Sequence, residues 1–275
     1  MIIIDGKELA EDVRDELKQN ITDLKLKPGL GIVLVGNNAG SEIYVRSKVK
    51  AAQEVGIRVQ LVQLAAEASK EKILATVRAM NADTSVNGIV VQLPLPRPEE
   101  ADEIISAIDP RKDVDGYHPA TLEALRKGDR EHIPVMGRVV LDMLGSFEID
   151  RKQVVIVARN PSFIEGLKLL LEELGTTVTS AAPDLADLGA ITRTADILIA
   201  AGNTENLITA DMVKEKAIVI DIGIMKTADG KTVGCVDFEN VSPKCRAITP
   251  VPGGVGPLTV AYLLWNTVLA CITTS

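Results

Sequence analysis

The segment LGIVLVGNNAGSEIYVRSKVKAAQEVGIRVQLVQL, residues 30–64, decides the expected fold. Two short apolar runs, residues 30–35 and 59–64, flank a stretch of helical period at 42–55. Ser41 is placed to cap this helix, and Gly56 to end it. An apolar strand, a helix and a second apolar strand form the repeating unit of a parallel sheet. The segment therefore predicts an α/β fold.

The same alternation continues along the chain and predicts two α/β units. In the first half we expect helices at 7–24, 69–82 and 99–108 and a strand at 86–93. In the second half we expect strands at 154–157, 177–181, 197–200 and 217–222, a helix that runs to residue 174, and a last apolar helix at 256–272. Ser162 and Glu165 fit a capping box for the helix ending at 174. Residues 110–137, punctuated by Pro and Gly, are expected to form the hinge between the units.

Length, composition and charge exclude several classes of protein. At about 100–200 residues per domain, the 275 residues correspond to roughly two domains. With 46% hydrophobic and 25% charged residues, the chain does not have the composition of a disordered protein. The net charge of −8 supplies no basic field for nucleic acid or for an anionic membrane. We therefore expect neither of these partners.

Cysteine, histidine and the N-terminus point to a soluble cytoplasmic protein without a metal site. The three cysteines have no CxxC spacing, which suits a reducing compartment. His118 and His132 are the only histidines, so a zinc site or a Ser-His-Asp triad has few residues to draw on. The apolar start at 1–4 ends at Asp5, too early for a signal peptide, and we expect no stretch near the roughly 18 apolar residues of a membrane span.

Four polar residues in the first unit could carry proton chemistry. Tyr44 and Lys48 are four residues apart in one helix and so share a face, although a surface lysine beside a half-buried tyrosine is the plainer interpretation. A desolvated lysine with a lowered pKa could carry a proton at neutral pH. Gln92 lies near the end of an apolar strand, where open α/β sheets bind ligands. Asp115 lies in KDVDG at 112–116. This segment is either a simple polar turn or a turn whose carboxylate accepts hydrogen bonds from an amino-pyrimidine.

Two loops elsewhere could approach a ligand. TPVPGGVGPLTV at 249–260 combines proline and glycine in a way that fixes a loop and lets its backbone come close to a ligand, or serves as a rigid connector. The strand at 154–157 runs into Ala158, Arg159 and Asn160, where a Rossmann-type domain places a pyrophosphate on a helix N-terminus. No GxGxxG is present, and many such turns bind nothing.

Four motifs in this order resemble one family of enzymes. YVRSK (44–48), VQLPLP (91–96), KDVDG (112–116) and TPVPGGVGPLTV (249–260) are similar to the bifunctional methylenetetrahydrofolate dehydrogenase/cyclohydrolase family. The resemblance runs from IDGK at 4–7 to the C-terminal helix. It implies oxidation of 5,10-methylenetetrahydrofolate with NADP, followed by hydrolysis of the methenyl product to 10-formyltetrahydrofolate.

The resemblance also implies roles for the residues of the first unit. Lys48 would be the general acid and base, Tyr44 would orient the pterin and the lysine, and Gln92 would hydrogen-bond Lys48. Asp115 would bind the amino-pyrimidinone, and Gly256 with Pro257 would line the folate pocket. The implied division is a folate-binding catalytic domain at 1–118 plus 256–275 and a Rossmann-like NADP-binding domain at 119–255. Members of the family commonly form homodimers, which we expect here.

The cofactor side departs from the family pattern. The resemblance assigns Ala158, Arg159, Asn160 and Ile224 to the cofactor, but the family glycines and a His-Ser pair are replaced. Arg159 favours the phosphate of NADP, whereas Asp184, near the end of the second strand of this unit, favours the ribose diol of NAD. We expect NADP, with NAD as the open alternative.

Three other functions stay open from the sequence alone. The chain could be a cyclohydrolase with a degenerate nucleotide domain, or a folate-binding paralogue without turnover. Another two-domain dehydrogenase of the amino-acid type would fit the architecture but not VPGGVGP at 251–257.

Overall fold

The chain folds into two compact α/β units, each described by itself. The computed structural model describes residues 1–130 and 133–274. The six-stranded unit comprises Met1–Ala10 and Met136–Thr259, and the three-stranded unit comprises Glu11–Val135 and Val260–Ser275. Both sheets contain only parallel strand pairs. The expected fold class, two α/β domains with mostly parallel sheets, is confirmed.

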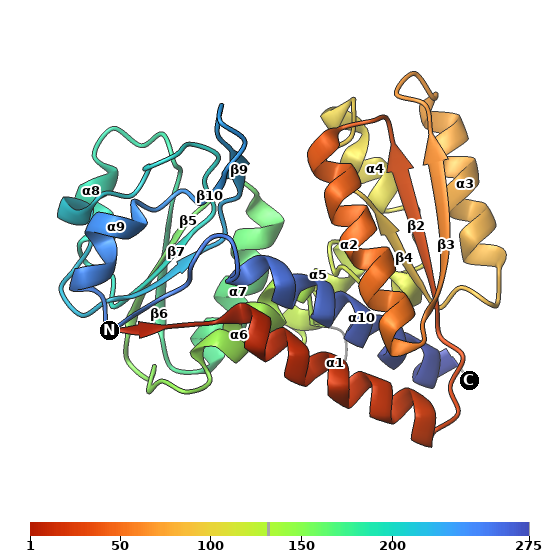
Figure 1. Ribbon diagram of the computed structural model, residues 1–275, viewed down its shortest axis with the longest axis horizontal. Helices are drawn as coiled ribbons and strands as arrows, with labels where there is room; N and C mark the ends of the chain where they lie inside the picture. The colour runs from red at the N-terminus through yellow and green to blue at the C-terminus, as the bar shows by residue number, and fades with distance from the viewer. Residues whose placement is uncertain (131–132, 275) are drawn as a thin grey trace. The chain divides into compact units, whose positions relative to one another are not determined.

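In the three-stranded unit the sheet order is β3-β2-β4. The strands are β2 (Gly29–Val35), β3 (Arg58–Leu64) and β4 (Gly88–Val91), and the helices α2 (Ala39–Val55) and α3 (Lys70–Ala82) lie on opposite sides of the sheet (Figure 1). Right-handed crossovers produce this arrangement, because the chain leaves β2 in one direction and returns from β3 in the other. Every residue of central β2 is buried, which explains its unbroken apolar sequence.

Three details of this unit correct the expectations. Asn38, not Ser41, caps α2, because its side chain accepts from the Ser41 backbone N–H at 3.0 Å and the helix starts earlier. Strand β4 ends at Val91, so Gln92 lies just beyond it. The helix expected at 99–108 is a 3-10 turn, Pro98–Glu100, followed by the short α4 (Ala101–Ile105).

The six-stranded unit has the strand order β1-β11-β8-β7-β5-β6. Its strands are β1 (Ile2–Ile3), β5 (Gln153–Val157), β6 (Thr177–Ala181), β7 (Ile197–Ala200), β8 (Ile218–Asp221) and β11 (Ala247–Ile248). An antiparallel pair, β9 (Met225–Lys226) with β10 (Thr232–Val233), stands apart from the sheet. From β5 the order proceeds to β6 on one side and to β7 on the other. The sheet therefore has a topological switch point at β5, the usual place for a ligand in such sheets.

The helices of this unit are short apart from α7. They are α6 (Val135–Leu144), α7 (Pro161–Glu173), α8 (Leu188–Thr192) and α9 (Phe238–Val241), with 3-10 turns at Ala210–Met212 and Ser242–Lys244. Asn160 caps α7 by accepting from the Phe163 backbone N–H at 2.9 Å. The capping box expected from Ser162 to Glu165 is therefore wrong, because Pro161 takes the first helical position and moves the cap to Asn160.

The segment expected as a hinge, 110–137, is largely helical where the structure describes it. It contains a 3-10 turn, Pro110–Lys112, helix α5 (Pro119–Arg126) and the start of α6. His118 caps α5, with Nδ1 accepting from the Ala120 N–H at 3.0 Å and Nε2 lying 3.2 Å from the Ser106 carbonyl. This histidine is thus used structurally, while His132 lies outside the described residues.

The compact units divide the chain at other positions than 118/119 and 255/256. Residues 1–10 join the six-stranded unit because β1 pairs with β11. Residues 119–135 join the three-stranded unit, where the Val135 N–H donates to the Asp115 carbonyl at 3.1 Å and Gly116 packs closely on Pro134. The division by ligand stays a prediction.

Two long helices, α1 (Gly6–Asp23) and α10 (Val255–Thr274), complete the fold. Helix α10 is long and apolar enough to cross a membrane by length and composition, so the expectation that no stretch comes near that length is wrong. About 61% of this stretch is buried, and the core helix of a soluble protein passes the same test.

Candidate active site

Lys48 lies at the centre of a polar cluster in the three-stranded unit. Helix α2 carries Tyr44 and Lys48 on one face, and both are half-buried. The Lys48 ammonium donates to Gln92 Oε1 at 3.0 Å, the contact that the family resemblance implies. Gln92 Nε2 in turn donates to the Leu93 carbonyl at 2.7 Å, which fixes the orientation of the amide. In the described part of the chain no hydrogen bond joins Tyr44 to Lys48, so Gln92 is the group that holds the lysine.

Lys48 and Asp115 each oppose the pKa shift that burial causes in the other. Burial lowers the pKa of Lys48, and the nearby Asp115 carboxylate partly opposes this shift. Burial raises the pKa of Asp115, and here Lys48 acts in the opposite direction. The cluster thus contains an ammonium that gives up its proton more readily than a surface lysine, together with a carboxyl group whose own pKa burial raises and Lys48 lowers.

The two aspartates of KDVDG have different tasks. Asp113 is buried and accepts from the backbone N–H groups of Gly116 (3.1 Å) and His118 (2.7 Å) and from Thr121 Oγ1 (3.2 Å). These bonds use its oxygens to shape the turn. Asp115 is half-buried and, with Asp113 and Tyr117, lines a small cavity of ≈10 Å³ beside β4, about the space of one water. Of the two, Asp115 is the carboxylate available to a ligand.

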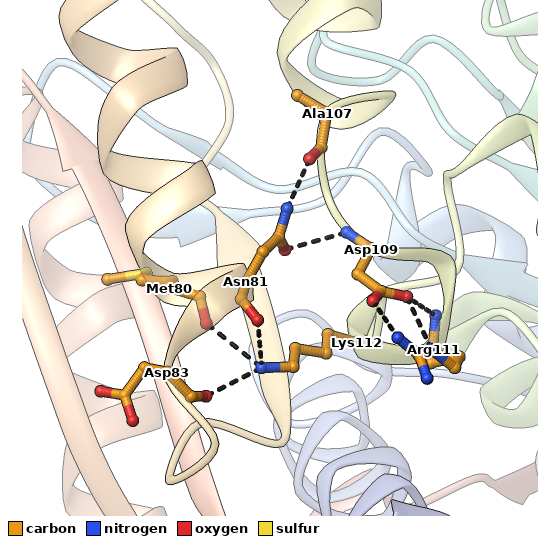
Figure 2. A network of polar contacts seen from close by, with 7 residues as sticks. All are labelled: Met80, Asn81, Asp83, Ala107, Asp109, Arg111 and Lys112. Carbon is orange, nitrogen blue, oxygen red and sulfur yellow. Dashed lines mark hydrogen bonds and ion pairs between the residues drawn. The ribbon is translucent and has the colours of Figure 1, made fainter.

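Lys112 anchors the segment that carries Asp115. Its ammonium donates to the carbonyls of Met80 (3.2 Å), Asn81 (2.8 Å) and Asp83 (2.8 Å) at the C-terminal end of α3 (Figure 2). A cation at a helix C-terminus satisfies carbonyls that the helix leaves unpaired. The Asn81 side chain extends the network by donating to the Ala107 carbonyl at 2.8 Å and accepting from the Asp109 N–H at 2.9 Å.

Lys112→Met is expected to lower the free energy of unfolding by about 2 kcal/mol, because three carbonyls lose a charged donor. Chemical denaturation of the purified protein measures this loss. The matched control is Lys72→Met, which changes an exposed lysine of α3, the helix whose last carbonyls Lys112 contacts. It should change stability by less than about 0.5 kcal/mol. Equal stabilities of the two variants would contradict the anchoring role.

Asn266 is a contributor to this region that the sequence did not single out. On α10, its Nδ2 donates to the carbonyls of Val114 (2.9 Å) and Ile133 (3.2 Å), while its Oδ1 is buried without a hydrogen-bond partner. It therefore holds the residue that precedes Asp115. An asparagine in a helix without charged residues was the available signal.

The proline- and glycine-rich loop places Gly256 and Pro257 in the first turn of α10, within the six-stranded unit. The Thr259 hydroxyl donates to the Gly256 carbonyl at 2.6 Å. The Gly254 N–H donates to the Pro250 carbonyl at 2.8 Å, and a Cβ on Gly254 would lie 2.6 Å from the Pro250 oxygen. Close backbone packing thus explains part of the glycine content of this loop.

The residues expected to bind the cofactor lie along the carboxyl edge of the six-stranded sheet. Ala158 is buried at the end of β5, and Asn160 is occupied with capping α7. Arg159 is exposed and forms an ion pair with Asp184, with 3.1 Å between Nη2 and Oδ2. Ile224 follows β8 and is 46% exposed. The switch point at β5, the exposed guanidinium and the start of α7 together fit a dinucleotide.

A buried carboxylate organises the turn that carries Ile224. Asp221 accepts from the backbone N–H groups of Gly223 (2.9 Å), Cys235 (3.2 Å) and Val236 (2.9 Å). Its own N–H donates to the Thr249 hydroxyl at 2.8 Å. Burial raises the pKa of Asp221, and these donors oppose the rise.

No cluster of three metal-ligating side chains occurs among the residues that the structure describes.

Comparisons with known proteins point to one family. Residues 4–115 match the model of the tetrahydrofolate dehydrogenase/cyclohydrolase catalytic domain, and residues 134–275 match that family's NAD(P)-binding domain. The chain is 42% identical to the bifunctional protein FolD of Nautilia profundicola, over 98% of this chain and 97% of that protein.

Solved structures give the same result. A bifunctional FolD enzyme of Campylobacter jejuni is 39% identical with a TM-score of 0.93, and the match covers 99% of each chain. The Trypanosoma brucei FolD, solved with NADP cofactor and an inhibitor, is 32% identical with a TM-score of 0.94, over 99% of this chain and 98% of that one. This chain therefore belongs to the tetrahydrofolate dehydrogenase/cyclohydrolase family.

Proposed function

We propose that this protein oxidises 5,10-methylenetetrahydrofolate to 5,10-methenyltetrahydrofolate with NADP and hydrolyses the product to 10-formyltetrahydrofolate. The observation that carries the proposal is the Lys48 cluster, in which a desolvated ammonium is held by Gln92 and balanced by Asp115. Hydrolysis of a cationic methenyl group needs a proton carrier and a positioned water, and neither a metal nor a nucleophilic side chain.

Lys48 is the proton carrier in this proposal. Its neutral amine takes a proton from water as the water oxygen bonds to the methenyl carbon. The resulting ammonium then gives that proton to the folate nitrogen whose bond to this carbon breaks. The remaining hydroxyl proton of the adduct passes to solvent as the C=O bond forms, leaving the formyl group on the other nitrogen. The hydrogen bond from Lys48 to Gln92 fixes the position of the amine, and Asp115 binds the amino-pyrimidinone edge of the folate. Tyr44, on the same face of α2, supports the pterin, and Gly256 with Pro257 contributes to the folate pocket.

The nucleotide is proposed to lie at the carboxyl edge of the six-stranded sheet. When bound, its nicotinamide supplies the hydride acceptor for the oxidation. Arg159 would pair with the 2′-phosphate, and the Ala158–Asn160 turn would face the pyrophosphate. Ile224 would pack near the nicotinamide. The NADP-bound structure of the trypanosomal relative supports NADP as the cofactor.

Domain assignment, assembly and location complete the proposal. Residues 1–118 with 256–275 would bind folate, and residues 119–255 would bind NADP. We expect a homodimer in the cytoplasm that takes neither nucleic acid nor membrane as partner. The acidic net charge of −8 supports the absence of nucleic acid.

One assay tests both activities together. Purified protein is incubated with methylenetetrahydrofolate and either NADP or NAD, and the absorbances of reduced nicotinamide and of methenyltetrahydrofolate are followed. Hydrolysis of methenyltetrahydrofolate is measured separately without cofactor. We expect NADP reduction and hydrolysis. Hydrolysis without reduction of either cofactor would leave a cyclohydrolase alone, and binding of folate without any turnover would leave a folate-binding paralogue.

A further inference from the structure

The ion pair between Arg159 and Asp184 joins two turns at the carboxyl edge of the six-stranded sheet. Arg159 lies two residues after β5, and Asp184 lies three residues after β6. The two strands are paired neighbours, and the Ala158 N–H extends the pairing by donating to the Ala181 carbonyl at 3.1 Å. Both charged side chains are more than 60% exposed, at 62% and 63%. The pair is therefore open to a ligand at the switch point of the sheet.

These two residue types make opposite demands on a dinucleotide at this place. In Rossmann-type folds a carboxylate after the second strand accepts hydrogen bonds from the ribose diol of NAD, and an arginine nearby accommodates the 2′-phosphate of NADP. Here the Asp184 carboxylate already forms an ion pair with the Arg159 guanidinium, with 3.1 Å between Oδ2 and Nη2. A 2′-phosphate that approaches Arg159 also approaches this carboxylate.

Few other groups in the two turns can hold a phosphate. Arg159 is the only cation within residues 158–161 and 182–184. Pro161 and Pro183 have no backbone N–H, and the Phe163 N–H is bonded to the Asn160 side chain. Recognition of the phosphate in these turns thus depends on the one guanidinium that Asp184 engages.

We propose that Asp184 is a specificity-determining residue that competes with the 2′-phosphate for Arg159, so that the enzyme accepts NAD as well as NADP. The inference rests on the proposed function, since it assumes that a dinucleotide binds at this edge. A 2′-phosphate carries about −1.5 to −2 charges at neutral pH, so its repulsion by a neighbouring carboxylate offsets part of the attraction to arginine. The backbone N–H of Asp184 itself and the Arg159 guanidinium lower the pKa of Asp184, which keeps the carboxylate charged.

Asp184→Asn tests the proposal, because it removes the charge and keeps the shape. Isothermal titration with adenosine 2′,5′-bisphosphate and with 5′-AMP measures recognition of the phosphate without any turnover. In Asp184→Asn we expect the affinity for the bisphosphate to rise about tenfold relative to that for 5′-AMP, and the gain to shrink with added salt. The ratio of kcat/KM for NADP over that for NAD should rise in parallel.

Two further variants separate this effect from a change in net charge. Glu172→Gln removes one negative charge from the exposed Lys168–Glu172 pair on α7 and should leave the affinity ratio unchanged. Arg159→Gln should abolish the preference for the bisphosphate whether or not Asp184 is present.

An unchanged ratio in Asp184→Asn, or an equal rise in Glu172→Gln, would overturn the inference and leave the proposed function intact. If the wild-type enzyme reduces NADP but binds neither adenosine 2′,5′-bisphosphate nor 5′-AMP, the inference is likewise overturned and the proposed function stands. If the ratio rises as expected but neither NADP nor NAD is reduced, the proposed dehydrogenase activity fails and the assignment of Asp184 stands.

Discussion

Lys48→Met is expected to slow the hydrolysis of methenyltetrahydrofolate by about 10³-fold, because the proton carrier is lost while the fold remains. Methionine fills a similar volume and removes a desolvated charge, so burial gives no reason for unfolding. The rate is followed by the loss of methenyl absorbance at saturating substrate, and circular dichroism and thermal melting check the fold.

Two companion variants show whether proton transfer or charge alone is at work. Lys48→Arg keeps the positive charge, but the guanidinium does not deprotonate in proteins, so it should be as slow as Lys48→Met. Lys50→Met removes an exposed lysine from the same helix, where it pairs with Glu54 at 3.8 Å, and should keep full activity. Full hydrolysis by Lys48→Met, or rescue by Lys48→Arg, would refute the role given to the amine.

Elements that are long and fully buried could be predicted from the sequence, and short or capped ones could not. Strands β2 and β5 are apolar runs whose burial on both faces leaves one interpretation. Strands β1 and β11 have two residues each and exist because they pair with each other in the sheet, which no local pattern reveals. The sequence predicts serine caps for α2 and α7, but in the structure Asn38 and Asn160 cap these helices. Serine and asparagine are both good N-cap residues, so the sequence alone does not choose between neighbours.

The candidate site shows the same division between local pattern and long-range contact. Tyr44, Lys48, Gln92 and Asp115 could be named from the motifs, since the first two share a helix face, Gln92 follows a strand and Asp115 lies in a polar turn. Asn266 could not, because its partner Val114 lies 152 residues away in the chain. In the sequence Arg159 indicates NADP and Asp184 indicates NAD, and only the structure reveals that the two side chains form an ion pair.

Asp115→Asn is expected to raise KM for the folate substrate by about 10- to 100-fold, because a charged hydrogen-bond partner becomes neutral. It should also change the pH dependence of kcat for hydrolysis. The Asp115 carboxylate raises the pKa of Lys48 against the lowering by burial, so its removal lowers the pKa of Lys48 further. The neutral amine is then populated at lower pH, and the limb of the profile that reports loss of the Lys48 proton moves in the acidic direction.

The two effects separate binding from proton transfer, since KM reports contact with the substrate and the limb reports the field at Lys48. Asp102→Asn, an exposed carboxylate on α4 of the same unit, is the control and should change neither. An unchanged KM would remove Asp115 from the folate pocket. A limb that stays in place or moves to higher pH would contradict its interaction with Lys48, and Asp115 would then serve binding alone, leaving Gln92 as the residue that sets the state of the lysine.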